Sequence, residues 1–233
     1  DAEEDVLEGI TFTVEPGETT AIIGSTGCGK STVVNLIPRF FDVSKGAVLL
    51  DDVDVREVSQ SNLRDKIGYI PQRGVLFTGT VESNLRFADQ DASEETLLEA
   101  LEIAQASEFV FANPEGVQAE ISQGGTNVSG GQKQRLSIAR ALVKKPPIFI
   151  FDDSFSALDF KTDAALRRAL KEKTGESTVL MVTQRVATVK AADQIIVLDN
   201  GKIVGKGTHR ELMETCQTYQ EIATSQLSKE ELA

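Results

Sequence analysis

One glycine-rich segment, Gly24 to Ser31, restricts the possible folds of this chain more than any other feature. It reads Gly-Ser-Thr-Gly-Cys-Gly-Lys-Ser, follows the apolar run Ala21 to Ile23 and opens a predicted helix. In such a loop, backbone N–H groups converge on phosphate oxygens, and the N-terminus of the helix adds positive potential. Lys30 supplies a positive charge, and the hydroxyl of Ser31 is suited to hold Mg²⁺. The segment therefore predicts a phosphate-binding loop between a strand and a helix.

A dinucleotide fold is the alternative for the same residues. Gly27 and Gly29 begin a G-x-G-x-x-G pattern, and Asp51 lies about twenty residues further on. Thr32 stands where that pattern needs its third glycine, so the dinucleotide alternative fails. The residues that we expect to contact a bound nucleotide in this loop are Ser25, Thr26, Gly27, Cys28, Gly29, Lys30, Ser31 and Thr32.

The rest of the chain alternates short apolar runs with helical patterns, as expected for a parallel sheet covered by helices. Between Gln72 and Pro146 the strand signal disappears, so we expect an inserted helical lobe there. Strands are expected at 47–50, 67–70, 148–152 and 178–183, and helices at 30–37, 94–106, 108–112, 131–145, 161–173 and from Thr208 onward.

Two turn sequences predict antiparallel hairpins. Pro16-Gly17 suits the central positions of a type II turn and predicts a hairpin between 10–15 and 18–23. Asn200-Gly201 predicts a second hairpin, between 194–199 and 202–206.

The composition excludes several classes of protein. With 40% apolar residues the chain can bury an ordinary core, which excludes a disordered or fibrous protein. The 24 basic and 36 acidic residues give a net charge of −12, which argues against broad nucleic-acid binding. Cys28 and Cys216 are too few for a disulfide framework and favour a reducing compartment. No membrane span or secretory signal is visible, so we expect a soluble chain cut from a longer polypeptide.

Two further strands are expected to end at the phosphate-binding loop. The apolar run 148–151 is typical of a strand buried on both faces, and it ends at Asp152. Ligands of parallel sheets lie beyond the carboxyl ends of the strands, so Asp152 is placed to hold Mg²⁺. The alternative for a lone Asp after a strand is a helix cap. The strand at 179–183 brings Gln184 to the same edge.

The segment 128–132, Val-Ser-Gly-Gly-Gln, stands before Lys-Gln-Arg-Leu-Ser-Ile-Ala-Arg at 133–140 and resembles the signature of ATP-binding cassette (ABC) ATPases. The phosphate-binding loop, a glutamine loop at 69–72, Asp152, a Ser-Ala-Leu-Asp turn at 156–159 and Gln184 complete the resemblance in family order, over nearly the whole chain. Small residues open the signature helix, so the amides of Ser129, Gly130 and Gly131 could bind an anion.

The resemblance implies an α/β fold of the P-loop NTPase (RecA-like) type, with a mainly parallel sheet, an antiparallel β subdomain and an inserted helical subdomain. It implies one nucleotide-binding domain over 1–233. Its ATP-binding core would occupy 1–72 and 146–207, its helical subdomain 73–145 and its C-terminal helical tail 208–233.

The resemblance also implies roles for single residues, with ATP and Mg²⁺ as cofactors. Ser31, Gln72 and Asp152 would hold the metal, and Lys30, Gln72, Asp153 and Gln184 would form the catalytic set. The family's adenine-stacking aromatic is expected upstream of residue 1, which leaves Val6 as a weak adenine contact. The further nucleotide contacts would be Gln72, Val128, Ser129, Gly130, Gly131, Gln132 and Asp159.

The sequence departs from the family at two catalytic positions. Asp153 stands where the family has Glu, and the loss of one methylene withdraws the carboxylate by about 1.5 Å. A misplacement of about 1 Å can cost on the order of 100-fold in rate. Gln184 stands where the family has a switch histidine, and an amide cannot carry positive charge toward a developing phosphoryl anion. The only histidine, His209, is expected to be structural.

These departures resemble the impaired half of a heterodimeric ABC exporter, and residues 76–84 also resemble exporter-type members. The resemblance implies a second, non-identical nucleotide-binding domain, a transmembrane domain of the same transporter and a position on the cytoplasmic face of the cell membrane. ATP would close the two domains head to tail, with slow turnover at this chain's own site. Two alternatives stay open: a non-hydrolysing regulatory ATP-binding module, and a soluble ABC ATPase not linked to transport.

Overall fold

The computed structural model describes residues 5–227, which fall into two compact units. The first unit contains residues up to 67 and from 178, and the second contains 68–177. These units differ from the subdomains expected from the sequence, because the second unit holds residues 68–72 and 146–177, which were expected in the ATP-binding core, together with the helical residues 73–145.

The first unit is built on four neighbouring strands in the order β10, β9, β1, β8. β1 (Thr19–Gly24) is parallel to both β8 (Thr178–Val182) and β9 (Gln194–Asp199), whereas β10 (Lys202–Gly207) is antiparallel to β9. The side chains at 21–23 are fully buried, as expected for a central strand covered on both faces. The predicted hairpin at Asn200-Gly201 is confirmed.

The predicted hairpin at Pro16-Gly17 is wrong, although the turn itself forms. The amide of Glu18 donates to the carbonyl of Glu15 over 3.2 Å, and Gly17 has a φ of 78°. Residues 10–15 are not a strand. The physical reason is that β8 and β9 occupy both edges of β1, which leaves no edge for an antiparallel partner.

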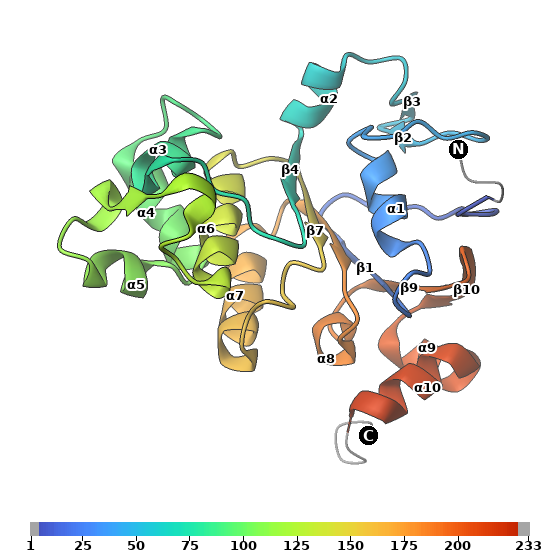
Figure 1. The fold of residues 1–233 in the computed structure, drawn as a ribbon. Coiled ribbons are helices and arrows are strands. Elements are labelled where there is room, and N and C mark those ends of the chain that lie inside the picture. The colour runs from blue at the N-terminus through green and yellow to red at the C-terminus, as the bar shows by residue number, and fades with distance from the viewer. Residues whose placement is uncertain (1–4, 228–233) are drawn as a thin grey trace. The chain divides into compact units, whose positions relative to one another are not determined.

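The helices of the first unit are short. α1 (Lys30–Leu36) follows the glycine-rich loop as predicted, and the predicted C-terminal helix is present as α9 (His209–Thr215) and α10 (Gln217–Gln226), which pack against β9 and β10 (Figure 1). Residues 228–233 of the predicted tail lie outside the described residues. The sequence did not predict α2 (Gln60–Asp65) or α8 (Val186–Val189), because such short helices give little periodicity. The paired strands β2 (Leu49–Leu50) and β3 (Val53–Asp54) complete the unit.

The second unit contains the helical lobe. The neighbouring strands β4 (Ile67–Ile70) and β7 (Ile148–Asp152) are as predicted. The helix α6 (Gly130–Val143) packs against α3 (Val81–Arg86) and α4 (Glu94–Ile103) (Figure 1). The prediction of a lobe without strands is wrong in one detail, because β5 (Gly79–Thr80) pairs with β6 (Glu120–Ile121); two residues are too few to produce an alternating pattern. The helices of this unit are α3 (Val81–Arg86), α4 (Glu94–Ile103), α5 (Ser107–Ala112), α6 and α7 (Phe160–Lys173).

The fold is therefore mixed α/β with a mainly parallel sheet, as the sequence predicts. Within residues 5–227, every helix is too short or too polar to cross a membrane.

Candidate nucleotide site

The glycine-rich loop joins β1 to α1, and its shape depends on its glycines. Gly27 and Gly29 have φ values of 82° and 102°, in the left-handed region that side chains disfavour. A Cβ at Gly24 would lie 2.1 Å from the carbonyl oxygen of Leu198. The loop can pass this close to β9 only without a side chain at Gly24.

Lys30 is the first residue of α1 and is 7% exposed. Its Nζ donates to the carbonyl oxygens of Gly24, at 2.8 Å, and Ser25, at 2.6 Å, and lies 3.7 Å from Sγ of Cys28. The ammonium group is therefore held inside the loop, where it can interact with a bound phosphate. Ser31, the next residue, is exposed.

Gln184 lies beyond the end of β8 and meets the glycine-rich loop. Oγ1 of Thr26 donates to Oε1 of Gln184 over 3.4 Å. The strand order explains the contact, because β1 and β8 are parallel neighbours whose carboxyl ends share an edge. The first unit thus brings together the glycine-rich loop and Gln184, two of the predicted parts of the site.

Val6 lies near the same loop, with 53% of its surface exposed. A Cβ at Gly29 would lie 3.6 Å from the carbonyl oxygen of Val6, and one at Gly201 would lie 2.3 Å from it. The amide of Gly201 in turn donates to the carbonyl of Cys28 over 3.1 Å. The segment around Val6 therefore packs beside the start of α1, where a base could contact it.

In the second unit, β7 ends at Asp152, which is 6% exposed. The hydroxyl of Tyr69 donates to Oδ2 of Asp152 over 3.1 Å. Burial, and then the charge of Asp152, raise the pKa of Tyr69, which keeps the hydroxyl a donor. The helix-cap alternative for Asp152 is excluded, because the next helix, α7, is capped by Asp159.

Asp153 follows directly and has a φ of 46°, in the left-handed region. It is 8% exposed, and its Oδ2 accepts a hydrogen bond from Nε2 of Gln72 over 3.2 Å. The carbonyl of Asp153 also accepts bonds from the amide and the hydroxyl of Ser156. Asp153 and Gln72, both members of the expected catalytic set, are therefore paired.

The signature segment opens α6 with a capping box. Oγ of Ser129 accepts from the amide of Gln132 over 3.3 Å, while the amide of Ser129 donates to Oε1 of Gln132 over 2.9 Å. The amide of Ser129, one of the three predicted to bind an anion, is therefore already paired inside the box. For Gly130 and Gly131 anion binding stays a prediction, and a Cβ at Gly130 would meet nothing within 4 Å. Val128 precedes the box and is partly exposed.

α6 also contacts the glutamine loop. Nε2 of Gln134, a side chain that is only 1% exposed, donates to the carbonyl of Pro71 over 3.1 Å. Gly74 is packed so tightly against α6 that a Cβ there would lie 2.7 Å from the carbonyl oxygen of Lys133. Sequence reasoning missed Gln134 and Tyr69; a polar residue on the apolar face of a predicted helix was the available signal for Gln134.

Asp159 serves as the N-cap of α7. Its Oδ1 accepts from the amide of Thr162 over 3.0 Å and its Oδ2 accepts from the Thr162 hydroxyl over 2.7 Å. The hydrogen bond from the Thr162 backbone lowers the pKa of Asp159. The side chain thus has a structural role in addition to the nucleotide contact expected from the sequence.

The residues expected to hold Mg²⁺ offer a hydroxyl, an amide oxygen and a carboxylate. Mg²⁺ prefers such oxygen donors and takes one or two carboxylates together with substrate phosphates. Nε2 of Gln72 donates to Asp153, so the amide oxygen of Gln72 is the atom that would be left to bind a metal. Residues 5–227 contain no group of three or more His, Cys, Asp or Glu side chains that could hold a metal. Each of Ser31, Gln72 and Asp152 carries an oxygen donor of the kind that Mg²⁺ prefers.

Comparison with known proteins agrees with the family resemblance seen in the sequence. The sequence pattern of the ABC transporter family matches residues 7–156. An ABC transporter ATP-binding protein of Mycobacterium tuberculosis is 52% identical over 224 residues, which are 95% of this chain and 38% of that protein. A Staphylococcus aureus protein, assigned by its name to multidrug export as an ATP-binding/permease protein, is 40% identical over 226 residues, 97% of this chain and 39% of its own length.

A solved structure is also similar. The structure of a bacterial Atm1-family ABC exporter with ATP bound has a TM-score of 0.94 and 35% identity, over 98% of this chain and 40% of that one. The chain spans about two fifths of the length of the curated relatives that it matches.

Proposed function

This chain belongs to the ABC transporter family as an ATP-binding domain, and we propose that it binds Mg-ATP to drive an exporter. The observation that carries the proposal is the glycine-rich loop with Lys30 held inside it. The names of the Staphylococcus aureus relative and of the Atm1-family structure support export as the direction of transport. The chain would then act on the cytoplasmic face of the membrane, joined to a transmembrane domain.

ATP would act between two domains. The exposed start of α6 offers the amides of Gly130 and Gly131 to an anion, yet α6 has no glycine-rich phosphate-binding loop of its own. The anion would therefore be the terminal phosphate of an ATP held by a second nucleotide-binding domain, in a head-to-tail pair. Hydrolysis would reopen the pair.

We further propose that this chain's own site turns over slowly and that its partner is a non-identical domain with Glu and His at the equivalent positions. The Asp153 side chain is one methylene shorter than the family's Glu, so its carboxylate would not reach the attacking water. That carboxylate is also paired with Gln72. Gln184 stabilises developing charge less well than a protonated imidazole would. The signature segment would meanwhile complete the active site of the partner.

The test is steady-state and single-turnover hydrolysis in the full-length transporter with its partner. We expect Lys30→Ala to weaken Mg-ATP binding at this site by at least roughly 10-fold and to leave most ATP turnover, because the partner's site carries it. Loss of the partner's lysine should leave only the slow turnover of this chain's own site. Brisk hydrolysis by a symmetric pair of this chain would overturn the proposed impairment.

A regulatory module in which ATP only holds the two domains together is the second candidate, favoured by Asp153 and Gln184. It is separated from the first by single-turnover hydrolysis at this site, which the regulatory module lacks. A soluble ABC ATPase acting on nucleic acid is disfavoured by the net charge of −12.

A further inference from the structure

The last residue of α10, Gln226, joins the C-terminal helix to the loop that carries Gln184. Its Nε2 donates to the carbonyl oxygen of Gln184 over 2.7 Å, and its Oε1 accepts from the amide of Val186 over 2.9 Å. The two bonds are made to the residues immediately before and after Arg185. A residue of a parallel neighbouring strand forms the same pair of bonds, donating to one of these residues and accepting from the other. The side-chain amide of Gln226 therefore pairs with the loop as one strand residue would.

The bond to Val186 also caps a helix. Val186 is the first residue of α8, and the N-cap residue, Arg185, makes no side-chain capping hydrogen bond. The first amides of a helix have no partner within the helix, so an acceptor from outside is needed. Gln226 supplies this acceptor from α10, a separate helix.

The loop between β8 and α8 is fixed at its other end by Thr183, which is 1% exposed. The amide of Thr183 donates to the carbonyl of Ile22 in β1 over 3.1 Å, and its Oγ1 accepts from the amide of Arg185 over 3.1 Å. Gln184 lies between this anchor and the Gln226 pair. Its side chain contacts Thr26 of the glycine-rich loop.

We infer that Gln226 is a positioning residue of the nucleotide site, through which the C-terminal helix controls the conformation of Gln184. The inference rests on the proposed function in one respect, namely that Gln184 acts beside the terminal phosphate. Gln226 does not touch the nucleotide. A partner or segment that displaces the end of α10 would release both peptide groups beside Arg185 and so change turnover.

Removal of the Gln226 side chain is expected to loosen the loop between β8 and α8 without lowering the stability of the first unit. Gln226 is exposed, so its removal opens no cavity in the core. Each net hydrogen bond changes an equilibrium by about fivefold. Loss of the Val186 bond should therefore raise the exchange of that amide by about fivefold or more, while the amides of β1 keep their protection.

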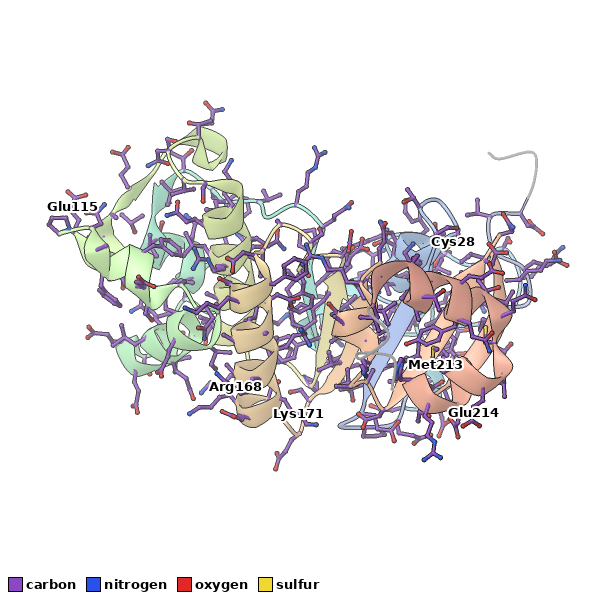
Figure 2. The ribbon with its side chains drawn as sticks, turned by 90° about the horizontal axis from the view of Figure 1, so that it is seen from below. Cys28, Glu115, Arg168, Lys171, Met213 and Glu214 are labelled. Atoms are coloured by element: carbon purple, nitrogen blue, oxygen red, sulfur yellow. The ribbon has the colours of Figure 1, made fainter. Side chains whose placement is uncertain are left out.

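The experiment compares three variants of the full-length transporter with its partner. Gln226→Ala removes both bonds, and Gln226→Glu keeps an acceptor for Val186 but cannot donate to Gln184. Gln220→Ala is the matched control, since Gln220 lies on the same helix and its Nε2 donates to the carbonyl of Met213 in α9 over 2.8 Å (Met213 is labelled in Figure 2). Hydrogen exchange of Val186, the Mg-ATP dissociation constant and the single-turnover rate of this chain's own site are measured for each variant, in a complex whose partner lacks its phosphate-binding lysine.

We expect Gln226→Ala to raise Val186 exchange and to lower the single-turnover rate about fivefold, with the Mg-ATP dissociation constant changed less than about twofold. Gln226→Glu should lower the rate as much but leave Val186 protected. Gln220→Ala should match the wild type in Val186 exchange and in the single-turnover rate. Equal effects of Gln220→Ala and Gln226→Ala, or wild-type exchange and rate in Gln226→Ala, would overturn the inference. A wild-type chain that binds no Mg-ATP would instead overturn the proposed function, because the exchange result does not depend on nucleotide.

Discussion

Nε2 of Gln72 lies 3.2 Å from Oδ2 of Asp153, so the glutamine that should contact Mg²⁺ holds the carboxylate that should direct water. Asp153 also has a left-handed backbone, which Asp tolerates better than Glu. The short side chain therefore suits the local geometry, and under the proposed function it would hold the carboxylate back from the attacking water.

Lengthening this carboxylate should restore hydrolysis. We expect Asp153→Glu to raise the single-turnover rate at this site by about 10- to 100-fold, because about 1 Å of reach can be worth that much. The left-handed backbone should make the variant slightly less stable to thermal unfolding. Asp153→Asn is the control, since it keeps the shape and loses the charge, and its rate should fall below wild type. An unchanged rate in a folded Asp153→Glu protein would contradict the argument from reach.

Lys30 should determine nucleotide affinity. Its ammonium group is buried in the loop and bonded to two carbonyls, so Lys30→Ala removes the one positive charge that the loop itself encloses. Hydrogen bonds to charged groups contribute about 1.5–3 kcal/mol each, so Mg-ATP binding by this site should weaken by at least roughly 10-fold. Calorimetric titration measures the change. Lys45→Ala, at an exposed position, should bind as the wild type does.

Ser129 allows stability and phosphate binding to be separated. Ser129→Ala removes the cap of α6 and should lower the free energy of unfolding by about 1 kcal/mol. Ser129→Asp keeps a good N-cap, so its stability should stay near wild type, but it places a negative charge beside Gly130 and Gly131. We expect Ser129→Asp to abolish ATP-driven pairing with the second domain, measured by crosslinking or light scattering. Pairing that survives in Ser129→Asp would show that no phosphate binds there.

Arg140 should stabilise the helical lobe. Its Nη2 donates to the carbonyl of Val75 over 2.9 Å and its guanidinium lies 5.2 Å from the ring centre of Phe77, while burial lowers its pKa. Lysine cannot reproduce the planar contact and the bond together, so Arg140→Lys should cost about 1–2 kcal/mol in urea unfolding. Arg168→Lys is the control, since Arg168 is exposed on α7 (Figure 2) and its change should stay within about 0.5 kcal/mol.

The C-terminal helices should lose stability in mild acid. Burial, and then the charge of Lys190, lower the pKa of His209, whose Nδ1 lies 2.8 Å from the hydroxyl of Tyr219. A histidine with a lowered folded pKa favours folding above its unfolded pKa of about 6.5, and that stability is lost as the pH falls through the folded value. The wild type should therefore lose more thermal stability than His209→Gln between about pH 7 and 5.5. An equal loss in both proteins would assign the effect to carboxylates.

The sequence predicts correctly those elements whose conformation depends on residues close together in the chain. The glycines, Lys30 and the flanking apolar run predicted the phosphate-binding loop because the loop's conformation depends on residues within it. Likewise, Asn200-Gly201 specified its hairpin through the backbone preferences of two adjacent residues. At Pro16-Gly17 the same reasoning predicted the turn correctly and the pairing wrongly, since a strand's partner depends on which edges of the sheet are occupied.

The family, the order of the motifs and the two unusual residues, Asp153 and Gln184, can therefore be read from the amino-acid sequence. The three-dimensional fold is needed to show which groups meet across long stretches of chain: Gln72 with Asp153, Thr26 with Gln184, and Gln226 with the backbone on both sides of Arg185. The reason is that a hydrogen bond depends on atoms within about 3 Å of each other, whereas sequence patterns report only the periodicity and conformational preference of neighbouring residues.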